Sequence, residues 1–303
     1  MKIIFPLICF IFLLQALPAQ TILPVPLNIK KTFDKGTRSA DGRPGKNYWQ
    51  NAADYTIDVN FNPASRVIKG TAVIIYTNNS PDTLKEIVFK LYPNIYKKGA
   101  VRLMNIKGED VTDGMMIEKL SANDVLMPSE NYRIDATNMS VRIQPLTPKQ
   151  TIQFNISYAY TLNKTSHMRT GEVEEGAYFI AYFFPRIAVY DDIDGWNRNP
   201  YLGTQEFYND FCNFKTSITV PGNYIVWATG DLKNSKDIFN PKYQQRIEQA
   251  ETTDGYVTII DSSEIKSERI TKNELSNTWI FEAKNVTDAV FALSNHIDGK
   301  APA

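Results

Sequence analysis

The sequence predicts an all-β, mainly antiparallel fold, built as saddle-like curved sheets or a β-sandwich with one or two short helices. Several segments alternate apolar and polar residues with a period of two, which is typical of strands with one buried face. Turn residues such as Asn62-Pro63 separate these segments. Helical signals are sparse by comparison, and many short strands with little helix favour a sandwich or a curved sheet.

The clearest strand covers residues 151–161, where five apolar side chains at even positions alternate with polar or small ones. The same pattern predicts strands over residues 55–61, 67–77, 84–92, 214–220, 224–229, 256–260 and 278–283. The best helical signal lies at residues 241–250. Asn240 stands there at the N-cap, and Pro241 at the first helical position.

Composition and charge exclude several functions. The 303 residues carry 33 basic and 33 acidic side chains, so no broad electrostatic attraction to nucleic acid or an anionic membrane is expected. The chain has only two His, His167 and His296, and neither has a His or Cys nearby in the sequence. We therefore expect no catalytic residue, no metal ligand set and no cofactor within this chain.

The N-terminus predicts a secretory signal peptide over residues 1–19. Lys2 precedes an apolar stretch of about a dozen residues, which is too short to span a bilayer, and small residues lead to a cleavage site after Ala19. We expect export to the periplasm or the medium, with no transmembrane segment. Residues 20–47 are expected to form a flexible arm and residues 48–303 one β domain. Cys212 would be the one Cys of the mature chain, so no internal disulfide is expected.

The acidic turn Asp191-Asp192-Ile193-Asp194-Gly195 is a candidate calcium loop. Placing Gly195 at loop position 6 puts Tyr190 and Tyr201 at positions 1 and 12, where an EF-hand requires acidic residues. The EF-hand is therefore rejected. A tight turn with Asx hydrogen bonds and an irregular calcium site both remain open.

Four stretches, residues 47–96, 110–125, 178–232 and 279–296, resemble one known family. The third is the most specific and begins YFIAYFFPRIAVYDDIDGWNRNPYLG. Together they resemble the N-terminal β domain of the aminopeptidase N family of zinc metallopeptidases (gluzincins), in the form common in Bacteroidetes-type bacteria. The resemblance covers residues 47–296, which is nearly the whole mature chain.

The resemblance implies a non-catalytic, substrate-cleft domain of an exported zinc metallo-aminopeptidase, which releases N-terminal amino acids from peptides. The family's zinc and its H-E-x-x-H motif belong to a following catalytic domain, which is absent from this sequence, so we expect a fragment or truncated form. The expected partners are that catalytic domain and the N-terminus of a peptide. The family's β domain holds the substrate α-amine with a Gln, whose position corresponds to Tyr182 here.

A Tyr hydroxyl can accept a hydrogen bond from an ammonium, and its ring offers a cation–π face. Tyr182 is therefore a candidate substrate-binding residue, although packing as a strand aromatic is an equal alternative. Arg186 and Trp196 are candidates to line the cleft or to pack. The turn residues Asp191, Asp192, Asp194 and Gly195 are expected to be structural.

Two other functions remain open. The chain could be a stand-alone exported β-sandwich module that binds a peptide or protein without enzymatic activity. An exposed apolar surface where a catalytic domain should dock would count against it. The chain could also be an enzyme in its own right, using the acidic side chains of residues 191–194 or Glu172, Glu174 and Glu175, although no nucleophile or base lies near them in the sequence.

Overall fold

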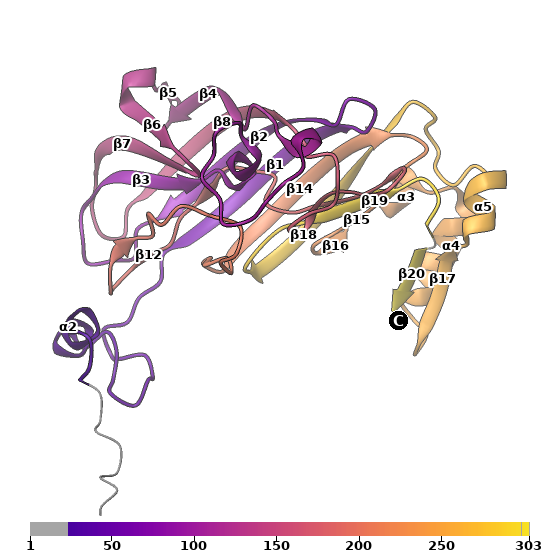
Figure 1. The fold of residues 1–303 in the computed structure, drawn as a ribbon. Coiled ribbons are helices and arrows are strands. Elements are labelled where there is room, and N and C mark those ends of the chain that lie inside the picture. Colours follow the sequence, from indigo (N-terminus) through magenta and orange to yellow (C-terminus); the bar gives the residue numbers. More distant parts are fainter. Residues whose placement is uncertain (1–23, 298, 303) are drawn as a thin grey trace, which may run out of the picture. The chain divides into compact units, whose positions relative to one another are not determined.

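The computed structural model describes residues 24–297 and 299–302 (Figure 1), and the predicted signal peptide lies outside them. The chain divides into two compact units, one ending at Tyr48 and the other beginning at Trp49. The first unit contains helix α2 (Leu27–Lys35), which ends at Gly36 in the left-handed conformation, with φ of 68°. This helix was not predicted. Thr32 is its buried residue, and Ile29 and Phe33 on the same face are half-buried. The helix has only nine residues, so its apolar pattern is too short to stand out in the sequence.

The largest sheet of the second unit has eight strands, and Figure 1 shows its long central strands side by side. Strand β1 pairs with β14 in parallel, and the other pairs are antiparallel. The prediction of a mainly antiparallel β fold is thus confirmed. In spatial order the strands are β16 (Asp231–Leu232), β18 (Ser276–Val286), β14 (Cys212–Pro221), β1 (Ala52–Asn62), β2 (Val67–Thr77), β8 (Thr151–Thr161), β4 (Met116–Ala122) and β5 (Val125–Leu126).

Two four-stranded sheets lie against the eight-stranded sheet. The first has the order β15 (Ile225–Ala228), β19 (Phe291–Ser294), β10 (Ala177–Ile180) and β9 (Thr170–Glu174). The second has the order β11 (Arg186–Ile187), β3 (Leu84–Lys90), β7 (Asn138–Leu146) and β6 (Tyr132–Asp135). Two antiparallel pairs complete the strands: the hairpin of β12 (Tyr190–Asp191) with β13 (Gly195–Trp196), and β17 (Tyr256–Ile260) with the distant β20 (Gly299–Pro302).

Helices are short and few. Helix α4 (Pro241–Ala250) has the predicted bounds, while α3 (Ser235–Ile238) and α5 (Ser262–Ser267) were not predicted. The described residues therefore hold four α-helices, including α2, instead of one or two. Short 3-10 turns occur at η2 (Tyr92–Tyr96), η3 (Gly108–Asp110) and η4 (Ser129–Asn131).

The core lies between the eight-stranded sheet and the two smaller sheets. Every second residue of β1 is buried, as the alternating sequence predicts. Phe154 of β8 meets Phe89 of β3 edge to face at 5.1 Å, and Phe61 of β1 meets Tyr178 of β10 at 5.1 Å. Both smaller sheets thus pack their apolar side chains against the same face of the large sheet. Among the described residues, no helix is long and apolar enough to cross a membrane.

Gly70 in the large sheet leaves room for the ring of Tyr158 on the neighbouring strand. A Cβ atom at Gly70 would lie 2.5 Å from the ring and hydroxyl of Tyr158 on the adjacent strand. The Tyr158 ring therefore occupies the space that a side chain on β2 would fill. Its hydroxyl is buried without a hydrogen-bond partner in the described structure, which costs free energy.

Candidate functional site

Tyr182 lies just after strand β10, where the backbone turns sharply. The residue has a φ of 43°, in the left-handed region that a bulky side chain rarely adopts. Its side chain is 2% exposed, and its hydroxyl donates a hydrogen bond to the Met168 carbonyl at 2.6 Å. The Ala181 amide donates to the Arg169 carbonyl at 3.2 Å. The turn after β10 is thus tied to the loop that precedes β9.

Strained backbone is concentrated at this junction. Met168 and Arg169 also have positive φ, at 51° and 65°, and both accept hydrogen bonds from the turn at Tyr182. Each such residue costs on the order of 1 kcal/mol or more, and it persists only where its surroundings hold it in place. Positions of this kind are concentrated at binding and catalytic sites, so the junction is the best candidate site in the described structure.

Aromatic rings enclose the Tyr182 side chain. Its ring centroid lies 5.9 Å from Tyr92, 6.3 Å from Tyr201 and 5.2 Å from Phe207. Tyr96 lies in the same cluster, and its hydroxyl donates to the His167 carbonyl at 2.8 Å. Burial raises the pKa of the Tyr182 hydroxyl well above its ordinary value, so this group stays neutral and can offer only a hydrogen bond. We name these five rings the tyrosine cluster.

The rim of the tyrosine cluster carries one charged pair. Arg169 lies over the Phe207 ring at 4.8 Å and forms an ion pair with Glu206 at 3.3 Å. The Glu206 side chain is 91% exposed, so this pair contributes little to stability. Two neighbouring loops meet here, because the Leu103 amide donates to the Leu202 carbonyl at 3.0 Å.

Arg186 is held inside the fold. Its side chain is 3% exposed and pairs with Asp288 at 3.4 Å. Its guanidinium also donates to the Asp210 carbonyl at 3.0 Å and lies over the Phe214 ring at 5.6 Å. The Cys212 sulfur is 3.8 Å from the same guanidinium. Arg186 thus joins strand β11 to β14 and to the loop before β19.

The acidic turn between β12 and β13 has the hydrogen bonds of an Asx turn. Asp191 Oδ1 accepts from the amides of Ile193 at 3.0 Å and Asp194 at 2.8 Å. Gly195 follows with a φ of 73°. Trp196 is half-buried and packs against Tyr190 at 5.1 Å. Asp192 lies in the same turn, and this geometry matches the structural alternative for the acidic sequence.

The structure separates the three predicted cleft residues. Tyr182 belongs to the tyrosine cluster, Arg186 to a buried ion pair, and Trp196 to the β12–β13 pair; no contact joins any two of them within the described part of the chain. The sequence did not single out Tyr92, Tyr96, Tyr201 or Phe207 as site residues. Three aromatics within residues 201–208 were a signal that could have drawn attention to Tyr201 and Phe207.

The described residues do not fit a zinc site. No group of three His, Cys, Asp or Glu side chains is placed to hold a metal ion in the described part of the chain. His296 Nε2 instead faces Glu174 at 3.2 Å, and the backbone of His167 is bonded to Thr170.

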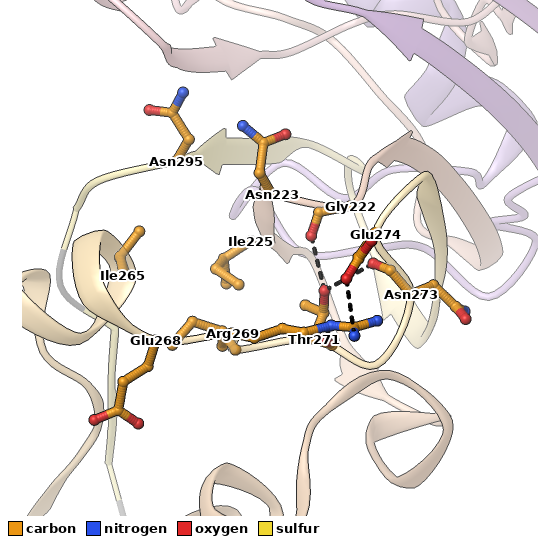
Figure 2. A pocket seen from close by; sticks show the side chains of 11 residues that line it. Gly222, Asn223, Ile225, Ile265, Glu268, Arg269, Thr271, Asn273, Glu274 and Asn295 are labelled. Carbon is orange, nitrogen blue, oxygen red and sulfur yellow. Dashed lines mark hydrogen bonds and ion pairs between the residues drawn. The ribbon is translucent and has the colours of Figure 1, made fainter.

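A separate pocket of about 280 Å³ lies beside helix α5 (Figure 2). Ile225 and Ile265 line its apolar part. Its charged Arg269 is already paired with Glu274 at 3.0 Å. Asn295 lies beyond the end of β19 that pairs with Ala177, whereas Tyr182 follows the opposite end of β10. This pocket is therefore not part of the site at Tyr182.

Comparison with known proteins gives matches to solved structures alone. No family profile and no curated protein matches the sequence. The structure is similar to an M1 zinc metallopeptidase from Deinococcus radiodurans, with a TM-score of 0.44 and 13% identity over 83% of this chain and 44% of that chain. A mutant of that enzyme bound to a Tyr-Ser-Ala substrate gives a TM-score of 0.43 and 13% identity over 82% of this chain and 44% of that one.

A third match is the Legionella pneumophila aminopeptidase A in complex with aspartic acid. It has a TM-score of 0.38 and 14% identity, over 79% of this chain and 21% of that chain. The chain spans less than half the length of these solved structures. The proteins that it matches are M1 zinc metallopeptidases and an aminopeptidase, the group that the sequence resembles.

Proposed function

We propose that this chain is the non-catalytic N-terminal domain of an exported zinc metallo-aminopeptidase and forms a wall of the substrate cleft. The parent enzyme removes N-terminal amino acids from peptides. Its zinc and hydrolytic residues lie in a catalytic domain outside this sequence, which is a fragment or truncated form. Residues 1–19 direct the protein to the periplasm or the medium.

The observation that carries this proposal is the setting of Tyr182. The resemblance implies that Tyr182 corresponds to the family's amine-binding Gln, in the most specific of the four stretches. The position lies at a junction of three residues with positive φ, enclosed by the tyrosine cluster. Strained backbone of this kind clusters at binding and catalytic sites. In this chain it includes Tyr182, the residue for which the resemblance implies contact with the substrate amine.

The surface around this junction supports a domain partner. Val101 is 72% exposed and Leu103 66% exposed, on the loop that is hydrogen-bonded to Leu202. Exposed apolar side chains close to a candidate site are typical of interaction surfaces. They favour a domain that packs against a catalytic partner over a stand-alone binding module.

The chain's own residues would position the peptide's N-terminus. The Tyr182 hydroxyl donates its proton to the Met168 carbonyl, which leaves its oxygen lone pairs to accept from an ammonium. Because Tyr182 is 2% exposed, an ammonium would reach this oxygen only after the loop at Met168 moves away from the ring, which also breaks the hydrogen bond to the Met168 carbonyl. Arg186 would act from inside the fold by fixing the backbone at Asp210, while half-exposed Trp196 would line the outer wall.

The test uses the full-length native protein. We expect one bound zinc per chain, hydrolysis of aminoacyl-coumarin amides, and loss of that activity on chelation. Tyr182→Phe should raise KM for these substrates severalfold with little change in kcat, because it removes an acceptor for the α-amine. Tyr182→Gln, which restores the family residue, should not weaken binding. Tyr256→Phe is the matched control, since Tyr256 is 83% exposed on β17.

Two results would contradict the proposal. A full-length product without zinc or peptide hydrolysis would refute the assignment to a zinc aminopeptidase. Normal activity with an unchanged KM in Tyr182→Phe would refute the role of the Tyr182 hydroxyl, while leaving the domain assignment standing.

A further inference from the structure

The outer face of the sheet β11–β3–β7–β6 carries more cations than carboxylates. The strand pairing places Lys90, Asn138 and Asp135 in one cross-strand row. The next row contains Ser140 and Arg133. Glu86 and Arg142 face each other in the row beyond.

Arg198, from the segment after β13, adds a further cation to this face. Its guanidinium pairs with Glu86 and donates to the Ser140 hydroxyl at 3.2 Å. The face therefore presents Arg133, Arg142 and Arg198 against two carboxylates, Glu86 and Asp135, while the side chain of Lys90 is buried.

These side chains enclose a pocket of about 230 Å³, lined by Arg133, Asp135, Asn138, Ser140 and Arg198. Within the described part of the chain, the guanidinium groups of Arg133 and Arg142 make no hydrogen bond or ion pair with protein groups. Arg133 thus offers five unused N–H donors at the pocket wall, in the planar arrangement that suits an oxyanion.

A buried ammonium lies behind the pocket. Lys90 is 2% exposed, and its Nζ donates to Asn138 Oδ1 and to the Asn199 carbonyl, both at 2.8 Å. Neither partner is a carboxylate, and burial lowers the pKa of Lys90 to about 8. Asn138 in turn donates to the Arg198 carbonyl at 2.6 Å, which holds the loop over the face. A buried cation without an anionic partner is costly, and a nearby anion offsets that cost.

We propose that the pocket between β6, β7 and Arg198 binds an oxyanion, the carboxylate or phosphate group of a small ligand. Arg133 supplies a bidentate contact. The Ser140 hydroxyl accepts from Arg198 and can donate its own proton to the anion. The Lys90 ammonium is hydrogen-bonded to Asn138, which lines the pocket, and its charge adds to the positive potential there. This pocket lies on strands β6 and β7, whereas Tyr182 follows strand β10. The proposal therefore does not depend on the proposed aminopeptidase function.

The test is a titration of the isotope-labelled protein followed by amide chemical shifts at constant ionic strength. Inorganic phosphate and acetate are titrated separately, with chloride as the reference anion, and the two arms tell which oxyanion the pocket takes. We expect saturable shifts at Asn138 and Ser140 with one of them. Arg133→Gln should weaken that binding about tenfold or more, as the loss of a charge-assisted bidentate contact predicts.

Lys69→Gln is the matched control, because Lys69 is an exposed cation on β2 of the other sheet. It should leave the binding unchanged. Non-saturable shifts that are equal for all three anions would overturn the proposal. So would equal losses in Arg133→Gln and Lys69→Gln, since these indicate a general response to surface charge.

Discussion

Asp210 gives the sharpest stability prediction, because its carboxyl is half-buried near Arg186 and makes no hydrogen bond of its own in the described structure. Within the described structure its carbonyl accepts hydrogen bonds from Arg186 and Cys212, and its side chain accepts none. Burial raises the pKa of this carboxyl from its ordinary value of 3.8 to about 6, although the charge of Arg186 opposes the rise. We expect Asp210→Asn to stabilise the protein at neutral pH.

The magnitude follows from the pKa. The folded state holds a proton on Asp210 up to about pH 6, whereas the unfolded chain releases it near pH 4. The folded state therefore binds more protons in this window, and the free energy of unfolding falls as the pH rises from 4 to 6. A tenfold change in a protonation constant corresponds to about 1.4 kcal/mol. Because Asp210 is partly exposed, the free energy of unfolding should fall by about 2 kcal/mol between pH 4 and neutral pH.

Urea unfolding at pH 4, 6 and 7.5 measures this effect. Asp210→Asn should resemble the wild type at pH 4 and exceed its unfolding free energy by about 2 kcal/mol at pH 7.5. Asp113→Asn changes an exposed carboxylate and should show no such gain. If Asp210→Asn is no more stable than the wild type at pH 7.5, then its carboxylate is stabilised in the fold and the reasoning fails.

Three other predictions concern buried or paired side chains. Tyr158→Phe removes a buried hydroxyl that has no hydrogen-bond partner in the described structure. Its free energy of unfolding should therefore rise by about 1 kcal/mol, seen as a higher urea midpoint. A lower midpoint would show that the hydroxyl makes a hydrogen bond in the fold. Burial raises the pKa of the Cys212 thiol to about 11, so a disulfide reagent should modify it only after denaturation, and rapid reaction of the folded protein would contradict its burial. Hydrogen bonds from Arg246 and Lys242 hold the pKa of Glu264 at about 2, so its contribution to stability should be present above about pH 4.5 and be lost as the pH falls toward 2. In Glu264→Gln, the free energy of unfolding measured between about pH 4.5 and pH 2 should fall less steeply than in the wild type, because this contribution is missing.

The strands were predictable where one face of the sheet is buried. Strands β2 and β8 have the predicted bounds, because burial of alternate side chains leaves a period of two in the sequence. The parallel pairing of β1 with β14 was not predictable. It joins strands separated by about half of the chain, and local periodicity contains no information about such a partner.

The unpredicted helices had different causes. Helix α2 has only nine residues, so the apolar pair Ile29 and Phe33 is too short a pattern to mark a helix. Helix α5 begins with a capping box, in which Asp261 accepts from the Ser263 amide and Glu264 reaches back to the Asp261 amide. The sequence DSSE at residues 261–264 is a recognisable signature of a helix start, and it was the signal available for this element.

The candidate site was predictable only at its centre. The resemblance pointed to Tyr182, but the ring's surroundings depend on η2 and on the 201–207 segment, which are distant in the sequence. Arg186 was a candidate to line the cleft or to pack, and its partner Asp288, about a hundred residues further along the chain, could not be read from the sequence. Contacts of this range follow from the packing of sheets, which one sequence does not reveal.

The central claim is that this chain is one domain of a larger exported zinc aminopeptidase. The most direct measurement is the intact mass of the native product from the source cells, with sequencing of its C-terminal peptides. The account predicts a mass well above the 34.4 kDa of these 303 residues, and peptides that continue past Ala303 into an H-E-x-x-H sequence. A mature product that ends at Ala303 would contradict it and would favour a stand-alone binding module.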